Sequence, residues 1–264
     1  MFNENRIISK WIADLYDQKV TETEDVDFLL SAIGQTPRRI FEVCCGSGRI
    51  LVPLAKAGHT VSGFDADAFM LAKIPAKAEG LVNIQWRAAD AVHSDWGTGF
   101  DAVVLFGNIL YNIVSDMDYA ASQELFLQKA AAALVPGGYV YIDYSPGGHR
   151  PTQQEETHKD SGEWIVWEGT DSEGNHGKMM LLAGAYDKDT RLDTFTRRFE
   201  LTLKNGESVM QDIPCVKHFA SLEQIQGWLS AAGFTAEQAY GDCTRSPITN
   251  DSTRAVIVAR KGAR

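Results

Sequence analysis

Between residues 39 and 144, short apolar segments alternate with longer amphipathic ones, and this alternation constrains the fold more than any other feature of the chain. The apolar segments are typical of strands and the amphipathic ones of helices. The run 103–105 is apolar throughout, as in a parallel sheet that helices cover on both faces. The pattern predicts a doubly wound, mostly parallel α/β sheet. The expected strands are 39–44, 60–64, 84–88, 100–106 and 139–144, and the expected helices are 49–57, 66–77 and 119–134.

The flanking segments complete this sheet and add a second domain. Helices are expected at 5–19, 23–34 and 221–232, and two last strands at 234–240 and 253–260 bring the sheet to seven. From residue 147 to 218 the rhythm changes to strand-like runs with a hairpin signal at Asn205-Gly206. We therefore expect one domain made of 1–146 and 219–264, and an antiparallel β insertion at 147–218 that forms a substrate lid or pocket. The runs within the insertion are 163–169, 178–186, 192–203 and 207–217.

A glycine turn follows the first strand, in the sequence Phe-Glu-Val-Cys-Cys-Gly-Ser-Gly of residues 41–48. Glycines let the backbone approach a ligand closely, and ligands of such folds bind at the carboxyl ends of the strands. A dinucleotide loop needs a further glycine where Leu51 stands, which argues against a bound pyrophosphate. Asp65 ends the second strand, where a carboxylate can accept both hydroxyls of a ribose or cap a helix. Asp90 follows the third strand, as an acceptor for an adenine amino group or as a solvated turn residue.

Taken in order, these motifs resemble those of the class I S-adenosylmethionine-dependent methyltransferases. Glu42 with Gly46 and Gly48 is similar to the first motif of that family, although Cys44 stands where the family has its first glycine. The resemblance implies that S-adenosylmethionine is the cofactor and S-adenosylhomocysteine the product. Residues 63–65, 89–91, 106–108 and 134–138 resemble the later motifs. The cofactor-binding residues implied are Tyr16, Glu42, Gly46, Gly48, Asp65, Ala66, Asp90, Ala91 and Phe106.

The methyl acceptor is less well defined by the sequence. A sulfonium methyl is already activated, so the enzyme needs mainly to orient a lone pair and exclude water. Residues 108–111, Asn-Ile-Leu-Tyr, are similar in spacing to the Asn-Pro-Pro-Tyr loop of enzymes that methylate amino groups, without its prolines. A turn with a packed tyrosine is the alternative. The insertion resembles that of glycine-type and sugar-amine N-methyltransferases. The candidate catalytic residues are Tyr16, Asn108, Tyr111 and His218, and the further pocket candidates are Tyr144, His149, Trp164, Trp167 and Arg198.

Charge and cysteine content narrow the function classes. The net charge of −10 and the pI of about 5.1 disfavour a nucleic-acid partner. The four cysteines form no metal-binding pattern and are expected as reduced thiols, and no metal is expected. No run is long and apolar enough for a membrane span. We expect a cytoplasmic monomer or homodimer that methylates a small molecule, more readily at nitrogen. An O-methyltransferase and a non-catalytic S-adenosylmethionine-binding module are the alternatives.

Overall fold

The computed structural model describes residues 4–146, 163–249 and 252–263. They fall into two compact units. One unit, here called the parallel unit, consists of residues 22–146 together with the described residues from 219 onward. The other, the antiparallel unit, consists of residues 4–21 and 163–218. No helix in these described stretches combines the length and the apolar composition that a bilayer span requires.

The parallel unit contains a seven-stranded sheet in the order β10-β11-β5-β4-β1-β2-β3. Neighbouring strands from β5 to β3 run parallel, while β11 is antiparallel to both β5 and β10. The predicted mostly parallel seven-stranded sheet is therefore confirmed. The strands are β1 (Arg39–Val43), β2 (Thr60–Asp65), β3 (Ile84–Ala88), β4 (Phe100–Leu105), β5 (Leu134–Tyr144), β10 (Phe234–Tyr240) and β11 (Ala255–Lys261).

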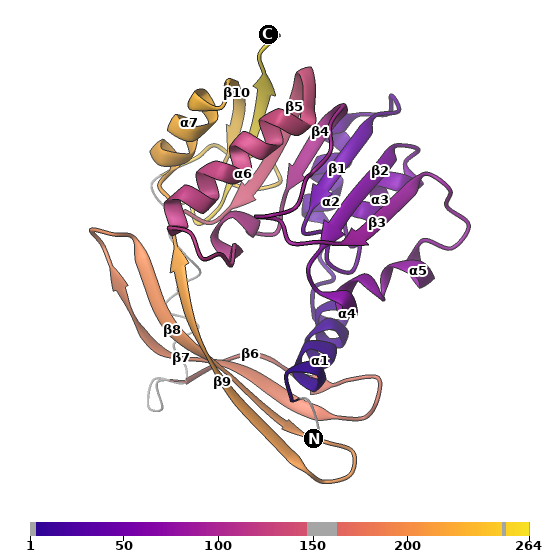
Figure 1. Ribbon diagram of the computed structural model, residues 1–264, viewed down its shortest axis with the longest axis vertical. Helices are drawn as coiled ribbons and strands as arrows, with labels where there is room; N and C mark the ends of the chain where they lie inside the picture. The colour runs from indigo at the N-terminus through magenta and orange to yellow at the C-terminus, as the bar shows by residue number, and fades with distance from the viewer. Residues whose placement is uncertain (1–3, 147–162, 250–251, 264) are drawn as a thin grey trace. The chain divides into compact units, whose positions relative to one another are not determined.

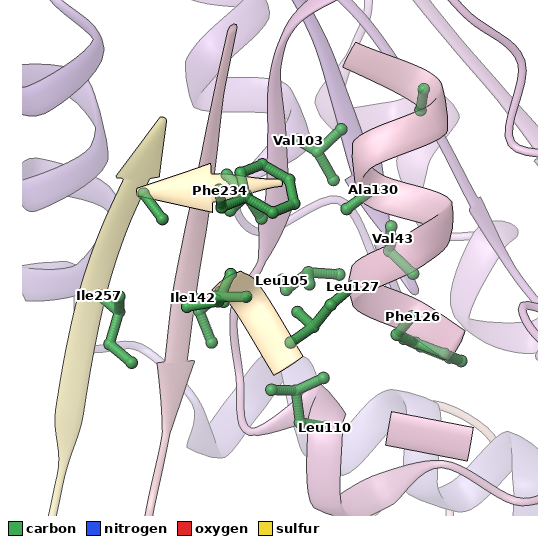
Figure 2. Packing of buried hydrophobic residues seen from close by; sticks show 14 of the residues in the cluster. Val43, Val103, Leu105, Leu110, Phe126, Leu127, Ala130, Ile142, Phe234 and Ile257 are labelled. Atoms are coloured by element: carbon green, nitrogen blue, oxygen red, sulfur yellow. The ribbon is translucent and has the colours of Figure 1, made fainter. Parts of the chain in front are cut away.

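Helices cover both faces of this sheet (Figure 1). On one face α6 (Tyr119–Ala133) packs on β4 and β5, and α7 (Leu222–Ala231) packs on β10. Helices α2 (Glu24–Ile33) and α3 (Leu51–Lys56) contribute to the core of the other face. Figure 2 shows the first of these cores, where side chains of α6 meet those of the central strands. Burying each of the larger apolar side chains there contributes roughly 1.5–3 kcal/mol.

The expected helix over 66–77 is wrong in one respect, because the chain forms two short helices there. These are α4 (Ala68–Leu71) and α5 (Ile74–Lys77), with Pro75 in the first turn of α5. Proline has no amide hydrogen to donate to the carbonyl four residues earlier, and its ring clashes with that carbonyl. A continuous helix would place this clash at Leu71, where α4 ends.

The fifth strand also begins earlier than expected, because residues 134–138 belong to it. β5 begins at Leu134, and residues 135–138 form an irregularity in its pairing with β4. A Cβ atom on Gly138 would lie 3.0 Å from the Val135 carbonyl oxygen and 3.1 Å from that of Asp101. Glycine at this position therefore lets the bulged backbone pack closely against β4.

The antiparallel unit contains a four-stranded sheet in the order β6-β7-β8-β9, as predicted for the insertion, and helix α1 (Glu4–Lys19). Trp11 and Leu15 of α1 are fully buried and cluster with Phe199 and Leu201 of the sheet. The indole Nε1 of Trp11 also donates to the Gly169 carbonyl at 3.2 Å. The strands are β6 (Glu163–Thr170), β7 (His176–Asp187), β8 (Leu192–Thr202) and β9 (Ser208–His218).

The compact units differ from the expected domain boundaries at the N-terminal helix. The sequence division placed residues 1–146 together, whereas residues 4–21 group with the antiparallel sheet. The apolar stripe of α1 identifies a buried helix, but the stripe carries no information on which sheet buries it.

Candidate active site

The predicted cofactor-binding segments follow the carboxyl ends of β1, β2, β3 and β4. Because these four strands are parallel, their carboxyl ends meet at one edge of the sheet. The glycine loop 44–48 follows β1, and Asp65 is the last residue of β2. Residues 89–91 follow β3, and residues 106–108 follow β4. The structure therefore brings all of these sequence motifs to the edge where doubly wound folds bind ligands.

Asp65 lies directly beside the glycine loop. The Gly46 amide donates to Asp65 Oδ2 at 2.9 Å, and the Cys45 amide donates to the Phe64 carbonyl at 2.8 Å. Burial raises the pKa of the Asp65 carboxyl, although its hydrogen bonds from backbone amides act in the opposite direction. The helix cap that was an alternative role for Asp65 belongs to Asp67, which accepts the amides of Phe69 and Met70.

The glycine loop has left-handed backbone at three of its residues. Gly46 and Gly48 have φ of +52° and +78°, and Cys44, at the position of the missing glycine, has φ of +56°. Residues that carry a side chain rarely adopt this backbone conformation, because it costs a residue other than glycine roughly 1–2 kcal/mol. A Cβ on Gly63 of β2 would lie 3.0 Å from the Cys45 Cβ, so that glycine lets the loop approach β2.

Glu42, the last residue but one of β1, is buried and lies two residues before this loop. Its side chain is 5% exposed, and Oε2 has no hydrogen-bond partner in the described part of the chain. Burial raises the pKa of Glu42 well above its usual range, and the charge of Arg49 opposes this shift. Arg49 is itself held by Asp25, with N–O distances of 2.7 and 2.5 Å. An unpartnered buried carboxylate oxygen is suited to a cation or a hydrogen-bond donor of a ligand.

The loop after β3 is fixed by a residue that sequence reasoning missed. Asp90 Oδ1 accepts the amides of Val92 and His93, each at 2.8 Å, so the turn role considered for Asp90 is present. The ammonium of Lys129, on α6, donates to the carbonyls of residues 91, 92 and 94 at 2.6–2.9 Å. Lys129 is 38 residues distant from Ala91 in the sequence, and no local pattern marks it.

The loop after β4 presents Asn108 in a left-handed conformation, with φ of +60°. Its side-chain Oδ1 is buried and makes no hydrogen bond with any described residue. The preceding amide, of Gly107, donates to Asp143 at 3.2 Å, and Asp143 also forms an ion pair with Arg254. Tyr111 lies in a 3₁₀ helix (Ile109–Asn112) with its ring 5.0 Å from that of Phe219. This ring contact is the packing expected for a turn with a packed tyrosine, and substrate contact by Tyr111 stays a prediction.

Other candidates lie in the antiparallel unit. Tyr16 contacts Trp167 edge to face at 6.1 Å, and His218 is a buried residue at the end of β9. Arg198 forms two hydrogen bonds of 2.7 Å with Asp212, so its charge is already neutralised.

Two further cofactor candidates, Ala66 and Phe106, lie in the parallel unit. Ala66 is exposed and Phe106 is buried. His149 lies outside the described residues.

The side chains at the carboxyl edge are mostly carboxyl groups and hydrogen-bond acceptors: Glu42, Asp65, Asp90 and the oxygen of Asn108. Such a set suits a ligand rich in N–H and O–H donors that carries positive charge. S-adenosylmethionine has this chemistry in its ribose hydroxyls, adenine amino group, ammonium and sulfonium. The residues present therefore fit this cofactor. No group of three or more His, Cys, Asp or Glu side chains in residues 4–146, 163–249 and 252–263 is placed to hold a metal ion.

A cavity of about 420 Å³ lies elsewhere in the parallel unit. It is lined by residues of α2, β5, β10 and β11, and by Asp101 near the amino end of β4. None of the predicted site residues lines it, so it is separate from the candidate site.

Comparison with known proteins agrees with this geometry. Residues 40–138 match the family described as a methyltransferase domain. A protein of Geobacillus sp. (strain WCH70) named as a methyltransferase is 24% identical over 229 residues, covering 86% of each chain. A ubiquinone biosynthesis O-methyltransferase of Chelativorans sp. (strain BNC1) is 32% identical over 127 residues, which span 44% of this chain and 47% of that protein.

Solved structures share the fold over nearly the whole chain. The CcbJ methyltransferase from Streptomyces caelestis has a TM-score of 0.71 at 21% identity, covering 97% of this chain and 98% of that one. The sugar N-methyltransferase KedS8 from Streptoalloteichus sp. ATCC 53650 has a TM-score of 0.68 at 17% identity, covering 94% and 91%. The family match over residues 40–138, the fold and the acceptor-rich edge agree: the chain carries a methyltransferase domain and is an S-adenosylmethionine-dependent methyltransferase.

Proposed function

We propose that this enzyme transfers the methyl group of S-adenosylmethionine to a nitrogen atom of a small molecule. The observation that carries the proposal is the buried, unpartnered Oδ1 of Asn108 after β4. An amine or amide nitrogen of the acceptor carries an N–H that this oxygen can accept. A neutral amine also presents its lone pair without a general base, which suits a site with few groups for proton transfer.

The cofactor would be held by the residues at the carboxyl edge. Asp65 would accept the ribose hydroxyls, and residues 90 and 91 would contact the adenine. The unpartnered oxygen of Glu42 would face the positively charged methionine end. When bound, S-adenosylmethionine supplies a methyl group on a positively charged sulfur. The protein orients the acceptor nitrogen toward that methyl group and excludes water. Such orientation can lower the activation free energy by about 7–11 kcal/mol.

The small-molecule acceptor is supported by the charge of the chain and by the neighbours. A net charge of −10 repels nucleic acids, and structural neighbours include sugar and aminopentose methyltransferases. We further propose that the antiparallel sheet contributes residues that recognise the acceptor, as the sequence analysis expected. The aromatic side chains Trp164 and Trp167, on β6, support this role.

Oxygen methylation is the second candidate function, and the similarity to a ubiquinone biosynthesis O-methyltransferase favours it. A hydroxyl acceptor generally needs a base to remove its proton during transfer. His218 is the candidate for that base, and Tyr16 and Tyr111 are the further candidates for contact with the acceptor.

The two candidates are separated by supplying ¹³C-methyl S-adenosylmethionine with pairs of acceptors that differ only in an amino or hydroxyl group. Amino sugars and their hydroxyl counterparts form such pairs, and the carbon shift of the product methyl distinguishes N–CH₃ from O–CH₃. We expect methylation of the amino member. Transfer confined to the hydroxyl member would refute nitrogen specificity.

Asn108→Gly tests the carrying observation directly. Glycine adopts a φ of +60° without strain, so this variant removes only the side chain. We expect kcat/KM for the amine to fall about 10- to 100-fold, from the loss of one buried hydrogen bond. Binding of S-adenosylmethionine, measured by calorimetry, should stay within about threefold. Asn108→Asp retains an acceptor oxygen and should retain more activity than Asn108→Gly.

A further inference from the structure

Arg197 lies on the same face of the antiparallel sheet as the residues that pack against α1. The register between β8 and β9 is unshifted from Leu192 to Thr202, so side chains alternate strictly between faces. Phe199 and Leu201 cluster with α1, and Arg197 is two residues before Phe199. Because residues two apart in a strand point to the same face, Arg197 shares the face of Phe199. Arg198, which sequence analysis named, points to the opposite face.

Apolar and aromatic residues surround Arg197 across the strands. Ile213 of β9 pairs directly with it on one side and Leu181 of β7 on the other. Trp164 of β6 pairs in turn with Leu181. Since directly paired residues share a face, the guanidinium rises from a row of apolar side chains. Phe195, two residues along β8, extends this apolar surface.

The guanidinium of Arg197 is incompletely satisfied. Its Nε is buried and has no hydrogen-bond partner among the described residues. The adjacent Arg198 shows the contrast, since its Nε and one terminal nitrogen each bond to Asp212 at 2.7 Å. A buried charged donor without an acceptor is more unfavourable than a neutral one in the same position. An acceptor supplied by a ligand would remove this cost.

A second cation lies on this face. Lys217 of β9 pairs with Asp193 of β8, four residues along the strand from Arg197 and so on the same side of the sheet. Burial lowers the pKa of Lys217 to about 8, and the positive charge of Arg197 acts in the same direction. Two cations are therefore close enough to repel each other, in a chain whose net charge is −10.

We propose that Arg197 and Lys217 form a binding site for the carboxylate or phosphate group of a small molecule whose apolar part lies on Trp164 and Phe195. A guanidinium binds both groups through paired, charge-assisted hydrogen bonds, and an anion also relieves the repulsion between the two cations. The anion site itself rests only on residues of the antiparallel unit.

Small probes test the site in the full-length protein. Benzoate and phenyl phosphate supply an aromatic ring with either anionic group, and benzyl alcohol is the neutral control. Binding is measured by calorimetry, and the Arg197 Nε–H resonance is followed in ¹⁵N-edited NMR spectra. We expect one of the anions to bind and to shift this resonance, while benzyl alcohol does neither. Preference for benzoate indicates a ligand with a carboxylate group, and preference for phenyl phosphate indicates a phosphorylated ligand.

Variants decide whether Arg197 carries the binding. Arg197→Gln should weaken the preferred probe at least about tenfold, and Lys217→Met at least about threefold. Arg198→Gln is the matched control, with the same change of charge on the opposite face, and should bind within about twofold of the wild type. Two results would overturn the site. One is an equal loss of probe affinity in Arg197→Gln and Arg198→Gln. The other is unchanged probe affinity in both Arg197→Gln and Lys217→Met. If circular dichroism shows that Arg197→Gln does not fold, Lys217→Met decides the question. Weaker probe binding by Lys217→Met would then support the site, and unchanged binding would overturn it.

The same titrations separate this site from the proposed function. S-adenosylmethionine affinity is measured for every variant and should not change, because neither Arg197 nor Lys217 is among the residues assigned to the cofactor. Failure of the wild-type protein to bind S-adenosylmethionine would refute the proposed function and leave the probe result intact.

Discussion

The amide of Gly46 donates a hydrogen bond of 2.9 Å to Oδ2 of Asp65, which joins the glycine loop to the end of β2. Asp65 Oδ1 accepts the amide of Asp67 at 2.8 Å. Both oxygens are thus oriented by the backbone, and each retains capacity to accept a further hydrogen bond. This orientation suits a carboxylate that accepts two neighbouring hydroxyl groups of a ribose.

Asp65→Asn should weaken S-adenosylmethionine binding about 10- to 100-fold, because hydrogen bonds to a charged acceptor contribute about 1.5–3 kcal/mol. Asp67→Asn is the control, since asparagine caps a helix as well as aspartate does. Its affinity should stay within about twofold of the wild type. Calorimetry measures both, and a folded Asp65→Asn protein with unchanged affinity would contradict the role of this carboxylate.

Glu42→Gln should stabilise the folded protein at neutral pH while weakening cofactor binding. Burial raises the pKa of Glu42 in the folded state, so the folded protein binds more protons than the unfolded one above about pH 4.5. The contribution of the Glu42 carboxyl to the free energy of unfolding is therefore fully present at low pH. It is lost as pH rises through the raised pKa of the folded state. Each pKa unit corresponds to about 1.4 kcal/mol.

The advantage of Glu42→Gln should accordingly grow with pH above about 4.5 and level off once the wild-type carboxyl is ionised. Urea unfolding of both proteins between about pH 4.5 and 8.5 measures this difference. A difference that does not vary with pH would show that Glu42 titrates normally. The cofactor should also bind more weakly to the same variant at a pH where the wild-type carboxyl is ionised, because the positive ligand then loses an anionic partner.

Cys44→Gly should be more stable than Cys44→Ala by about 1 kcal/mol. Both variants lose the thiol, but only alanine retains the strain of a side chain at φ of +56°. At an ordinary position the order is reversed, because glycine loses more backbone entropy on folding. Thermal unfolding of the two variants gives the sign.

Gly48→Ala provides the complementary test within the same loop. Its new Cβ would lie 3.1 Å from Ile74 Cγ1 and 3.2 Å from Val52 Cγ2, at a φ of +78°. We expect a loss of about 2 kcal/mol from strain and crowding together. A neutral effect would mean that the loop relaxes freely and does not hold a fixed shape.

Lys129→Met should loosen the loop that follows β3. The ammonium of Lys129 satisfies three carbonyls of residues 91–94, and its loss leaves these acceptors without a fixed partner. We expect faster hydrogen exchange at the amides of Val92 and His93, and roughly a three- to tenfold loss of S-adenosylmethionine affinity. Lys56→Met, at an exposed site on α3, is the control and should alter neither measurement.

The sequence alone determined the parallel sheet and the order of the loops that form the candidate site. The period of apolar residues distinguishes strand from helix, and parallel strands must bring their carboxyl ends to one edge. Gly46 and Asp65, 19 residues apart, could therefore be assigned to one site before their hydrogen bond was known. The hairpin of the antiparallel sheet was also predictable, since Asn205-Gly206 is a strong local turn signal.

Only the tertiary structure decided which surface each residue faces and which distant residue completes its environment. The choice between Arg197 and Arg198 depends on strand register, because adjacent residues of a strand point to opposite faces. The placement of α1 and the carbonyl contacts of Lys129 likewise depend on packing between segments far apart in the sequence. Local patterns encode periodicity and turns, whereas burial and charge pairing arise from contacts that the folded chain makes across long sequence separations.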